Sequence, residues 1–171
     1  MANRTEKDLI GEKLIEDSSY IGINTIRALE NFNLHSKTVN LNLINDIALI
    51  KKAAAIVNKS LKELEVEKAE AIIQASNELI EGRFDDEFKI SAFQGGAGTS
   101  TNMNVNEVIA NRAIEILGEK KGDYTIIHPL NDVNMSQSTN DVYPTGLRIA
   151  AIRLIRKLSN SLADLQEALQ V

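Results

Sequence analysis

Apolar residues recur at helical spacing along most of the chain, and the longest such pattern lies towards its C-terminal end. From Tyr143 onward the apolar positions repeat at gaps of 4, 3, 4, 4, 3 and 4 residues, through Leu147, Ala151, Leu154, Leu158, Leu162, Leu165 and Leu169. This heptad seam is typical of helices that pack side by side in a bundle or coiled coil. The sequence therefore predicts a long helix whose packing partners lie in a second copy of the chain or in sequence not present here.

Shorter helical patterns come before this one. Residues 40–64 and 66–82 carry apolar side chains at gaps of three and four, and Gly82 is placed to end the second helix. A third helix is predicted from about Val105 to Leu117, stopped by Gly118. The residues expected to face inward are Leu43, Ile47, Ile50, Ala54, Asn58 and Leu61 in the first helix, and Val66, Ala69, Ile73 and Leu79 in the second.

Two segments have the composition of extended structure. Residues 17–25 and 123–127 are rich in β-branched and aromatic residues, which favours a short strand or an extended arm. Residues 26–32 favour one or two helical turns, and the charged run at 83–93 is expected to be a solvated connection. His128 precedes a proline and is therefore expected at a turn, in a structural or surface role.

Two clusters of small polar residues interrupt the apolar pattern, at 94–107 and at 134–146. Serine, threonine and asparagine belong at turns and helix starts, where they compete for backbone hydrogen bonds. The same uncharged donors, together with a helix N-terminus, can hold a small polar or anionic ligand. Asn102 and Asn106 share a helical face, so this pair points either to a site or to capping and turn chemistry.

The glycine-rich part of the first cluster, 95–98, does not fit a nucleotide site. A P-loop requires Gly-Lys-Ser/Thr, and the first lysine after this loop is Lys120. A dinucleotide fingerprint requires a preceding buried strand and a βαβ rhythm, and neither is predicted. The glycines do allow backbone N–H groups to approach a small anion closely.

The amino-acid composition excludes several classes of protein function. The chain of 171 residues has a net charge of −5, is 43% hydrophobic and contains no cysteine, which excludes disulfides and thiolate chemistry. An acidic chain with 4% aromatic residues is a poor nucleic-acid binder, and no apolar run is long enough for a membrane helix. With a polar N-terminus and no signal-peptide pattern, the protein is expected to be cytoplasmic. No metal or cofactor is expected.

Three segments, 20–32, 95–107 and 134–141, resemble the aspartase/fumarase superfamily in order and spacing. Within it they are most similar to the aspartate ammonia-lyases, in Gly96-Ala97, Ser100 and Thr139, where fumarases usually have Gly-Ser-Gly-Thr-Gln and Gln-Ser-Ser-Asn. The resemblance implies a mainly α fold with a short extended or β arm. It implies a helical domain at 1–140, carrying two substrate-binding loops, and the truncated start of a central bundle helix at 141–171.

The resemblance also implies a reaction, the reversible deamination of L-aspartate to fumarate and ammonia. Its dianionic aci-carboxylate intermediate requires preorganised donors in a dry site. By the family pattern, Thr99, Ser138, Thr139 and Asn140 bind the substrate: Thr99 and Thr139 at the activated carboxylate, and Asn140 at the leaving amine. Supporting candidates are Gly98, Ser100, Asn102 and Asn106.

Departures from the family pattern limit this implication. The Gly-Ser-Ser loop that supplies the serine base, and the Met-Pro-x-Lys-x-Asn run that supplies a lysine, do not occur in the sequence. No catalytic base is therefore assigned in this chain, which is expected to be inactive alone, because the family builds each site from three subunits of a homotetramer. Fumarases form a secondary anion site in the segment that corresponds to 128–134, and whether this chain binds an anion there stays open, because the segment departs from their pattern.

Two alternatives to an aspartate ammonia-lyase remain open. One is a class II fumarase-like hydratase, which shares the loops but acts on malate. The other is a non-catalytic helical oligomerisation module that associates through the seam from Leu147 to Leu169. The module accounts for the seam and leaves the two polar clusters unexplained.

Overall fold

The computed structural model describes residues 2–34, 37–94 and 96–170, and in them the fold is mainly helical with one small sheet, as predicted. Gly95, which belongs to the glycine-rich segment, lies outside the described residues. The elements, in chain order, are β1 (Asn3–Lys7), β2 (Glu12–Glu16), α1 (Ile23–Asn31), α2 (Leu41–Ser60), α3 (Val66–Ile80), η1 (Asp85–Glu87), α4 (Thr99–Ile116), η2 (Pro129–Val133) and α5 (Thr139–Leu169).

The N-terminal arm is an antiparallel hairpin in which Asn3 lies opposite Glu16 and Lys7 opposite Glu12. The extended segment predicted at 17–25 was misplaced, because the strands lie earlier and α1 already begins at Ile23. The helix prediction for 26–32 was right, since α1 continues to Asn31. A carboxylate from α4, Glu107, accepts the backbone N–H groups at the start of α1, and local sequence patterns do not reveal such a distant cap.

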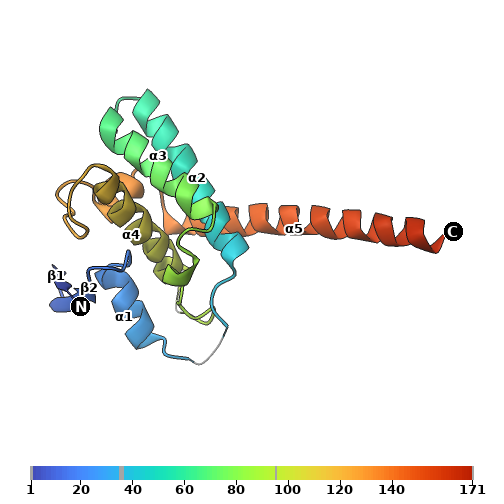
Figure 1. Ribbon diagram of the computed structural model, residues 1–171, viewed down its shortest axis with the longest axis horizontal. Coiled ribbons are helices and arrows are strands. Elements are labelled where there is room, and N and C mark those ends of the chain that lie inside the picture. Colours follow the sequence, from blue (N-terminus) through green and yellow to red (C-terminus); the bar gives the residue numbers. More distant parts are fainter. Residues whose placement is uncertain (1, 35–36, 95, 171) are drawn as a thin grey trace.

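The core lies where α2, α3 and α4 pack together, as Figure 1 shows. Ile47, Ile72 and Ile109, one from each helix, are completely buried, and burial of such side chains stabilises a fold by about 1.5–3 kcal/mol each. The inward face of α2 was predicted partly wrongly. Leu61, which directly follows α2, is exposed, and the buried positions of α2 include instead Ile44, Ala48, Lys51 and Ala55. In α3, Val66 was predicted to face inward and is exposed.

One helix boundary and one segment differ from the sequence prediction. α4 begins at Thr99 instead of near Val105, so Asn102, Asn104 and Asn106 lie inside the helix and are buried. The segment 123–127 forms turns and not an extended piece, with the Asp123 N–H donating to the Lys120 carbonyl. His128 has the predicted structural role, because its Nδ1 accepts the N–H groups of Leu130 and Asn131 at the start of η2.

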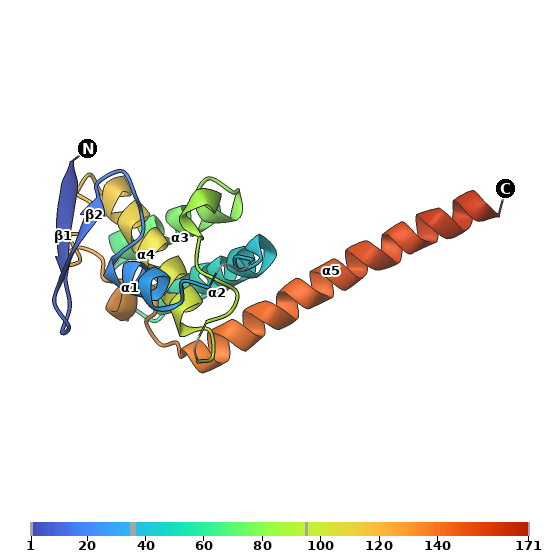
Figure 2. The same cartoon turned by 90° about the horizontal axis from the view of Figure 1, so that it is seen from below.

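Helix α5 leaves the core after its first three turns and projects alone, as Figures 1 and 2 show from two directions. Its predicted seam is exposed: Leu154 is 44% and Leu162 55% accessible. Arg153 pairs with the buried Asp46 of α2, close to where α5 leaves the core. Across the described residues, no helix combines the length and apolarity that crossing a membrane requires.

Candidate functional site

The two polar clusters meet where α4 and α5 begin. Gly98, the residue before α4, has φ 82°, and a Cβ added to it would lie 2.2 Å from Cδ2 of the Tyr143 ring. Only glycine allows this approach without strain. Beside the contact is a cavity of about 280 Å3, lined by residues from both clusters: Ala92, Gln94, Gly96, Ala97, Gly98, Asn140, Tyr143 and Pro144.

Gln94 forms hydrogen bonds on both sides of the glycine-rich loop. Its Nε2 donates to Thr101 Oγ1 at 2.7 Å and to the Ser91 carbonyl at 3.2 Å, while its Oε1 accepts the Thr101 N–H at 3.0 Å. One amide side chain thereby connects the segment before the loop to the first turn of α4. These bonds fix the first turn of α4 relative to the segment before the loop, so the backbone at the start of α4 is preorganised.

Each of the two helix starts has a backbone donor that is not used within the described structure. The backbone N–H groups of Ser100 and Thr139 find no acceptor among the residues that the structure describes. The first N–H groups of a helix lack intrahelical partners and carry a partial positive charge. Two such termini side by side form a region suited to an anion with more than one carboxylate.

The predicted binding residues occupy these termini in different ways. Ser138 is the cap of α5, and its Oγ accepts the Asn140 N–H at 3.3 Å, so the capping interpretation also holds for it. Asn140 is exposed and lines the cavity, and Thr99 is exposed as the first residue of α4. Ser138 lines a second hollow of about 180 Å3 with Ser136 and Asp141, so the four residues are not all brought to one cavity.

Beneath Thr139 lies a buried hydrogen-bonded cluster centred on Asn134. Its Oδ1 accepts from Asn102 Nδ2 at 3.1 Å, from Asn106 Nδ2 at 3.3 Å and from Lys51 Nζ at 2.6 Å. Asn102 Nδ2 also donates to Thr139 Oγ1 at 2.9 Å. The predicted asparagine pair therefore does share a face, and Asn102 connects it to the second polar cluster through Thr139.

Lys51 is the residue of this region that the sequence analysis missed. It is fully buried and faces Asn134, with no carboxylate within ion-pairing distance among the described residues. Burial lowers the pKa of its amine to about 7. A signal was present, because Lys51 lies four residues from both Ile47 and Ala55, on the apolar face of α2.

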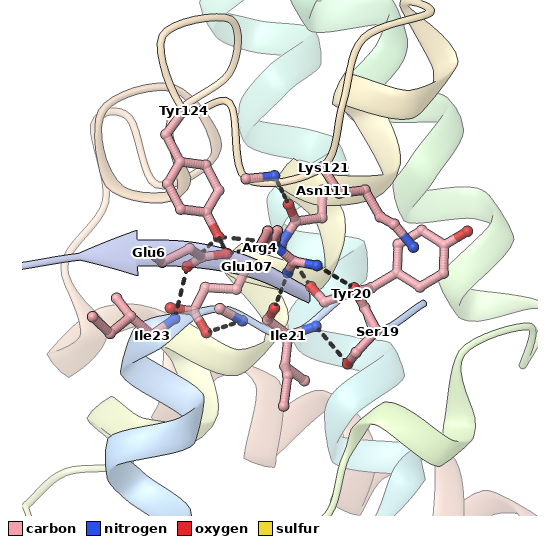
Figure 3. Close-up of polar contacts among 12 residues, drawn as sticks. Arg4, Glu6, Ser19, Tyr20, Ile21, Ile23, Glu107, Asn111, Lys121 and Tyr124 are labelled. Carbon is pink, nitrogen blue, oxygen red and sulfur yellow. Dashed lines mark hydrogen bonds and ion pairs between the residues drawn. The ribbon is translucent and has the colours of Figure 1, made fainter. Parts of the chain in front are cut away.

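The far half of α4 is anchored to the N-terminal arm, as Figure 3 shows. Glu6 accepts from Arg4 Nε, from the Ile23 N–H and from the Tyr124 hydroxyl, at 2.9–3.1 Å. Burial raises the pKa of the Tyr124 hydroxyl, and the Glu6 and Glu107 carboxylates act in the same direction. This cluster therefore anchors α4, the helix that begins directly after the glycine-rich loop.

The site contains neutral donors and no assembled set of metal ligands. Within residues 2–34, 37–94 and 96–170, no three His, Asp or Glu side chains are grouped so that they could hold a metal ion. Hydroxyl, amide and backbone N–H groups are suited to stabilising negative charge on a bound carboxylate. No general base is apparent among the residues that line the cavity.

Comparison with known proteins identifies relatives of this arrangement. Residues 11–171 match the model of a family described as "Lyase". The aspartate ammonia-lyase of Bacillus subtilis (strain 168) is 50% identical over 162 residues, which are 95% of this chain and 34% of that protein. The class II fumarate hydratase of Wigglesworthia glossinidia brevipalpis is also 50% identical, over 157 residues, 92% of this chain and 34% of its own length.

Solved structures share the fold. A fumarate lyase:delta crystallin from Brucella melitensis, solved bound to cobalt, matches with a TM-score of 0.92 and 48% identity, over 95% of this chain and 36% of that one. A class II fumarase from Schistosoma mansoni matches with a TM-score of 0.82 and 37% identity, over 87% of this chain and 32% of that one. The present chain thus spans about a third of the length of the relatives it matches.

Proposed function

Because the chain belongs to the lyase family whose model matches residues 11–171, we propose that it provides two substrate-binding loops of an enzyme that releases fumarate from L-aspartate. The observation that carries the proposal is the meeting of the two helix starts: Gly98 and Asn140 line one cavity, and the N–H groups of Ser100 and Thr139, in the same helix starts, have no acceptor among the described residues. Aspartate and fumarate each have two carboxylates, which two adjacent anion-binding termini can hold.

The donors suit the chemistry of the proposed reaction. Removing a proton from the carbon beside a carboxylate creates a doubly negative aci-carboxylate, and preorganised donors lower the energy of that state. Thr99 and Thr139 are proposed to bind the activated carboxylate and Asn140 the leaving amine, with Ser138 also binding the substrate from the cap position of α5. Gly98, Ser100, Asn102 and Asn106 support them. The proton acceptor is proposed to come from a segment outside this chain.

A hydratase acting on malate is the second candidate. The fumarate hydratase relative is as identical to this chain as the aspartate ammonia-lyase, at 50% each. The aspartase assignment rests on local residues, Gly96-Ala97, Ser100 and Thr139. An amine and a hydroxyl are both small leaving groups beside the same two carboxylates, so the loop geometry alone serves either reaction.

The proposed assembly follows from the exposed seam of α5. Leucines exposed along one face of a helix form an apolar surface that favours association with a partner. We propose a cytoplasmic homo-oligomer in which residues 141–171 of this helix join a bundle shared between subunits. Residues 1–140 would form the helical domain that carries the loops. The purely structural module remains the alternative, and it would leave the unused donors at the two helix starts without a role.

A fusion separates these candidates. The 171 residues would be joined to the remaining two-thirds of the Bacillus subtilis relative, and fumarate formation would be followed by absorbance with aspartate and with malate. The proposal expects turnover of aspartate, and at least a tenfold loss in an Asn140→Ala fusion. Turnover of malate alone would establish the hydratase. A folded fusion inactive on both would contradict the proposal, with the native relative as the positive control.

A further inference from the structure

The hydrogen-bonded cluster below the candidate site determines which way the Thr139 hydroxyl can donate. A threonine hydroxyl has one proton and two acceptor positions. Thr139 Oγ1 already accepts a hydrogen bond from Asn102 Nδ2 at 2.9 Å. Since Asn102 presents a donor, the hydroxyl proton of Thr139 must point elsewhere, and it finds no acceptor among the described residues.

The orientation of Asn102 is fixed by its second contact. Both hydrogens of its amide nitrogen are used, one on Thr139 and the other on Asn134 Oδ1 at 3.1 Å. A reversed Asn102 amide would place its oxygen against the Asn134 oxygen, which is repulsive. The side chain is 1% exposed, so water cannot relieve that contact freely.

The orientation of Asn134 is fixed in turn by Lys51. A protonated amine has only donors, so the atom that faces Lys51 Nζ at 2.6 Å must be the Asn134 oxygen. Asn134 Nδ2 then donates to the Gln137 carbonyl at 3.0 Å, which agrees with that assignment. The direction of each bond follows from the one before it, from Lys51 through Asn134 and Asn102 to Thr139.

We propose that Asn102 is a positioning residue, held by Asn134 and Lys51, which leaves the Thr139 hydroxyl free to donate to a carboxylate of the substrate. The inference rests on the proposed function and extends it to a buried residue that does not touch the ligand. A hydroxyl whose oxygen accepts from Asn102 keeps its proton for another acceptor, so no bond of that proton within the described structure has to break when the anion binds.

The test uses the complete 171-residue chain and succinate, a dicarboxylate that cannot undergo the reaction. Succinate affinity would be measured by nuclear magnetic resonance titration at about pH 6, where the Lys51 amine is protonated. Four proteins form a double-mutant cycle: the unaltered chain, Asn102→Leu, Thr139→Val and the double variant. Asn104→Leu is the matched control, because Asn104 is an equally buried asparagine of α4 whose side-chain NH2 donates to the Glu87 carbonyl and not to Asn134 or Thr139.

The proposal expects Asn102→Leu to weaken succinate binding about tenfold, the effect of one hydrogen bond to a charged group. In the Thr139→Val background the same change should have little further effect, because the hydroxyl it orients is absent. Asn104→Leu should bind succinate within about twofold of the unaltered chain. Equal losses in both asparagine variants, or additive losses in the double variant, would overturn the positioning role and leave the proposed function standing.

A measurement without ligand distinguishes a failure of the proposed function from a failure of the positioning role of Asn102. In the unaltered chain the two side-chain amide protons of Asn102 should exchange slowly with water, and Thr139→Val should shift one of them. If the shift is observed but the unaltered chain does not bind succinate, the proposed function is overturned, and the positioning role of Asn102 is overturned with it. No shift would overturn the positioning role alone. If Asn102→Leu does not fold, Asn102→Asp replaces it, because a carboxylate would accept the Thr139 proton and weaken succinate binding in the same way.

Discussion

The Glu107 carboxylate accepts two hydrogen bonds from Thr25, one from its hydroxyl at 2.6 Å and one from its backbone N–H at 3.0 Å. Gly22 and Asn24 donate to the same carboxylate, so Glu107 caps α1 from within α4. Burial raises the pKa of this carboxyl, although the hydrogen bonds from Thr25 and Asn24 act in the opposite direction. The interaction joins the N-terminal arm to the helix that carries the first loop.

Glu107→Gln should therefore destabilise the fold by about 2–3 kcal/mol. A glutamine has one acceptor oxygen and would turn its NH2 group towards at least one of the backbone donors. Urea unfolding followed by circular dichroism measures the effect, and Glu63→Gln, at an exposed position, is the matched control. A loss below about 0.5 kcal/mol, the usual range for surface changes, would contradict the capping role.

Gly98→Ala tests the close approach between the two loops. Gly98 and Gly118 both have positive φ, 82° and 85°, but an added Cβ would strike the Tyr143 ring only at Gly98. Gly118→Ala should cost about 1–2 kcal/mol from backbone strain alone, and Gly98→Ala should cost at least about 1 kcal/mol more. Equal losses in thermal unfolding would show that Tyr143 does not pack against the glycine-rich loop.

The buried amine of Lys51 should make the stability depend on pH. Its pKa is lowered from 10.5 to about 7 by burial, so between these values the unfolded chain binds more protons than the folded one. The free energy of unfolding should then rise from about pH 7 to pH 9, by at most roughly 1.4 kcal/mol per unit from this group. Below about pH 7 the contribution is constant, because both states are protonated.

Lys51→Met removes this titration and serves as the comparison. The difference in unfolding free energy between the two proteins should change with pH above about pH 7 and stay level below it. Chemical denaturation at a series of pH values provides the measurement. Parallel pH profiles for the two proteins would mean that the amine keeps its ordinary pKa and is not buried as described.

The exposed seam of α5 should cause self-association. Leu158→Glu places a charge on the seam, and Ser159→Glu places the same charge on an adjacent exposed position outside it. Sedimentation equilibrium should show association of the unaltered chain and of Ser159→Glu, and at least a tenfold weaker association of Leu158→Glu. A monomeric unaltered chain at all concentrations would count against the proposed oligomer.

The helices of this fold could be predicted because their apolar spacing is regular over long segments. The heptad gaps of α5 and the glycine after α3 are local signals, and both agree with the structure. The capping of α1 could not be predicted, since the carboxylate that caps it, Glu107, lies more than 80 residues away in sequence. The start of α4 was placed too late because asparagines favour turns, whereas here their side-chain NH2 groups donate to Asn134 and to the Glu87 carbonyl, which lie outside the helix.

The sequence predicted the two loops of the candidate site but not the buried residues that hydrogen-bond beneath them. Residues such as Asn140 and Gly98 belong to dense polar clusters that stand out in the sequence. Lys51 lies in a run typical of an ordinary helix, and its role depends on Asn134, which is 83 residues away. Contacts over such separations follow from tertiary packing, which residue spacing does not reveal.

The central claim is that the two helix starts together hold a dicarboxylate. Titration of the unaltered 15N-labelled chain with succinate tests it most directly, with chloride at matched ionic strength as the control. The account predicts saturable changes that are largest at the backbone N–H groups of Ser100, Thr139 and Asn140. Saturable changes centred elsewhere, or none at these three residues, would contradict it.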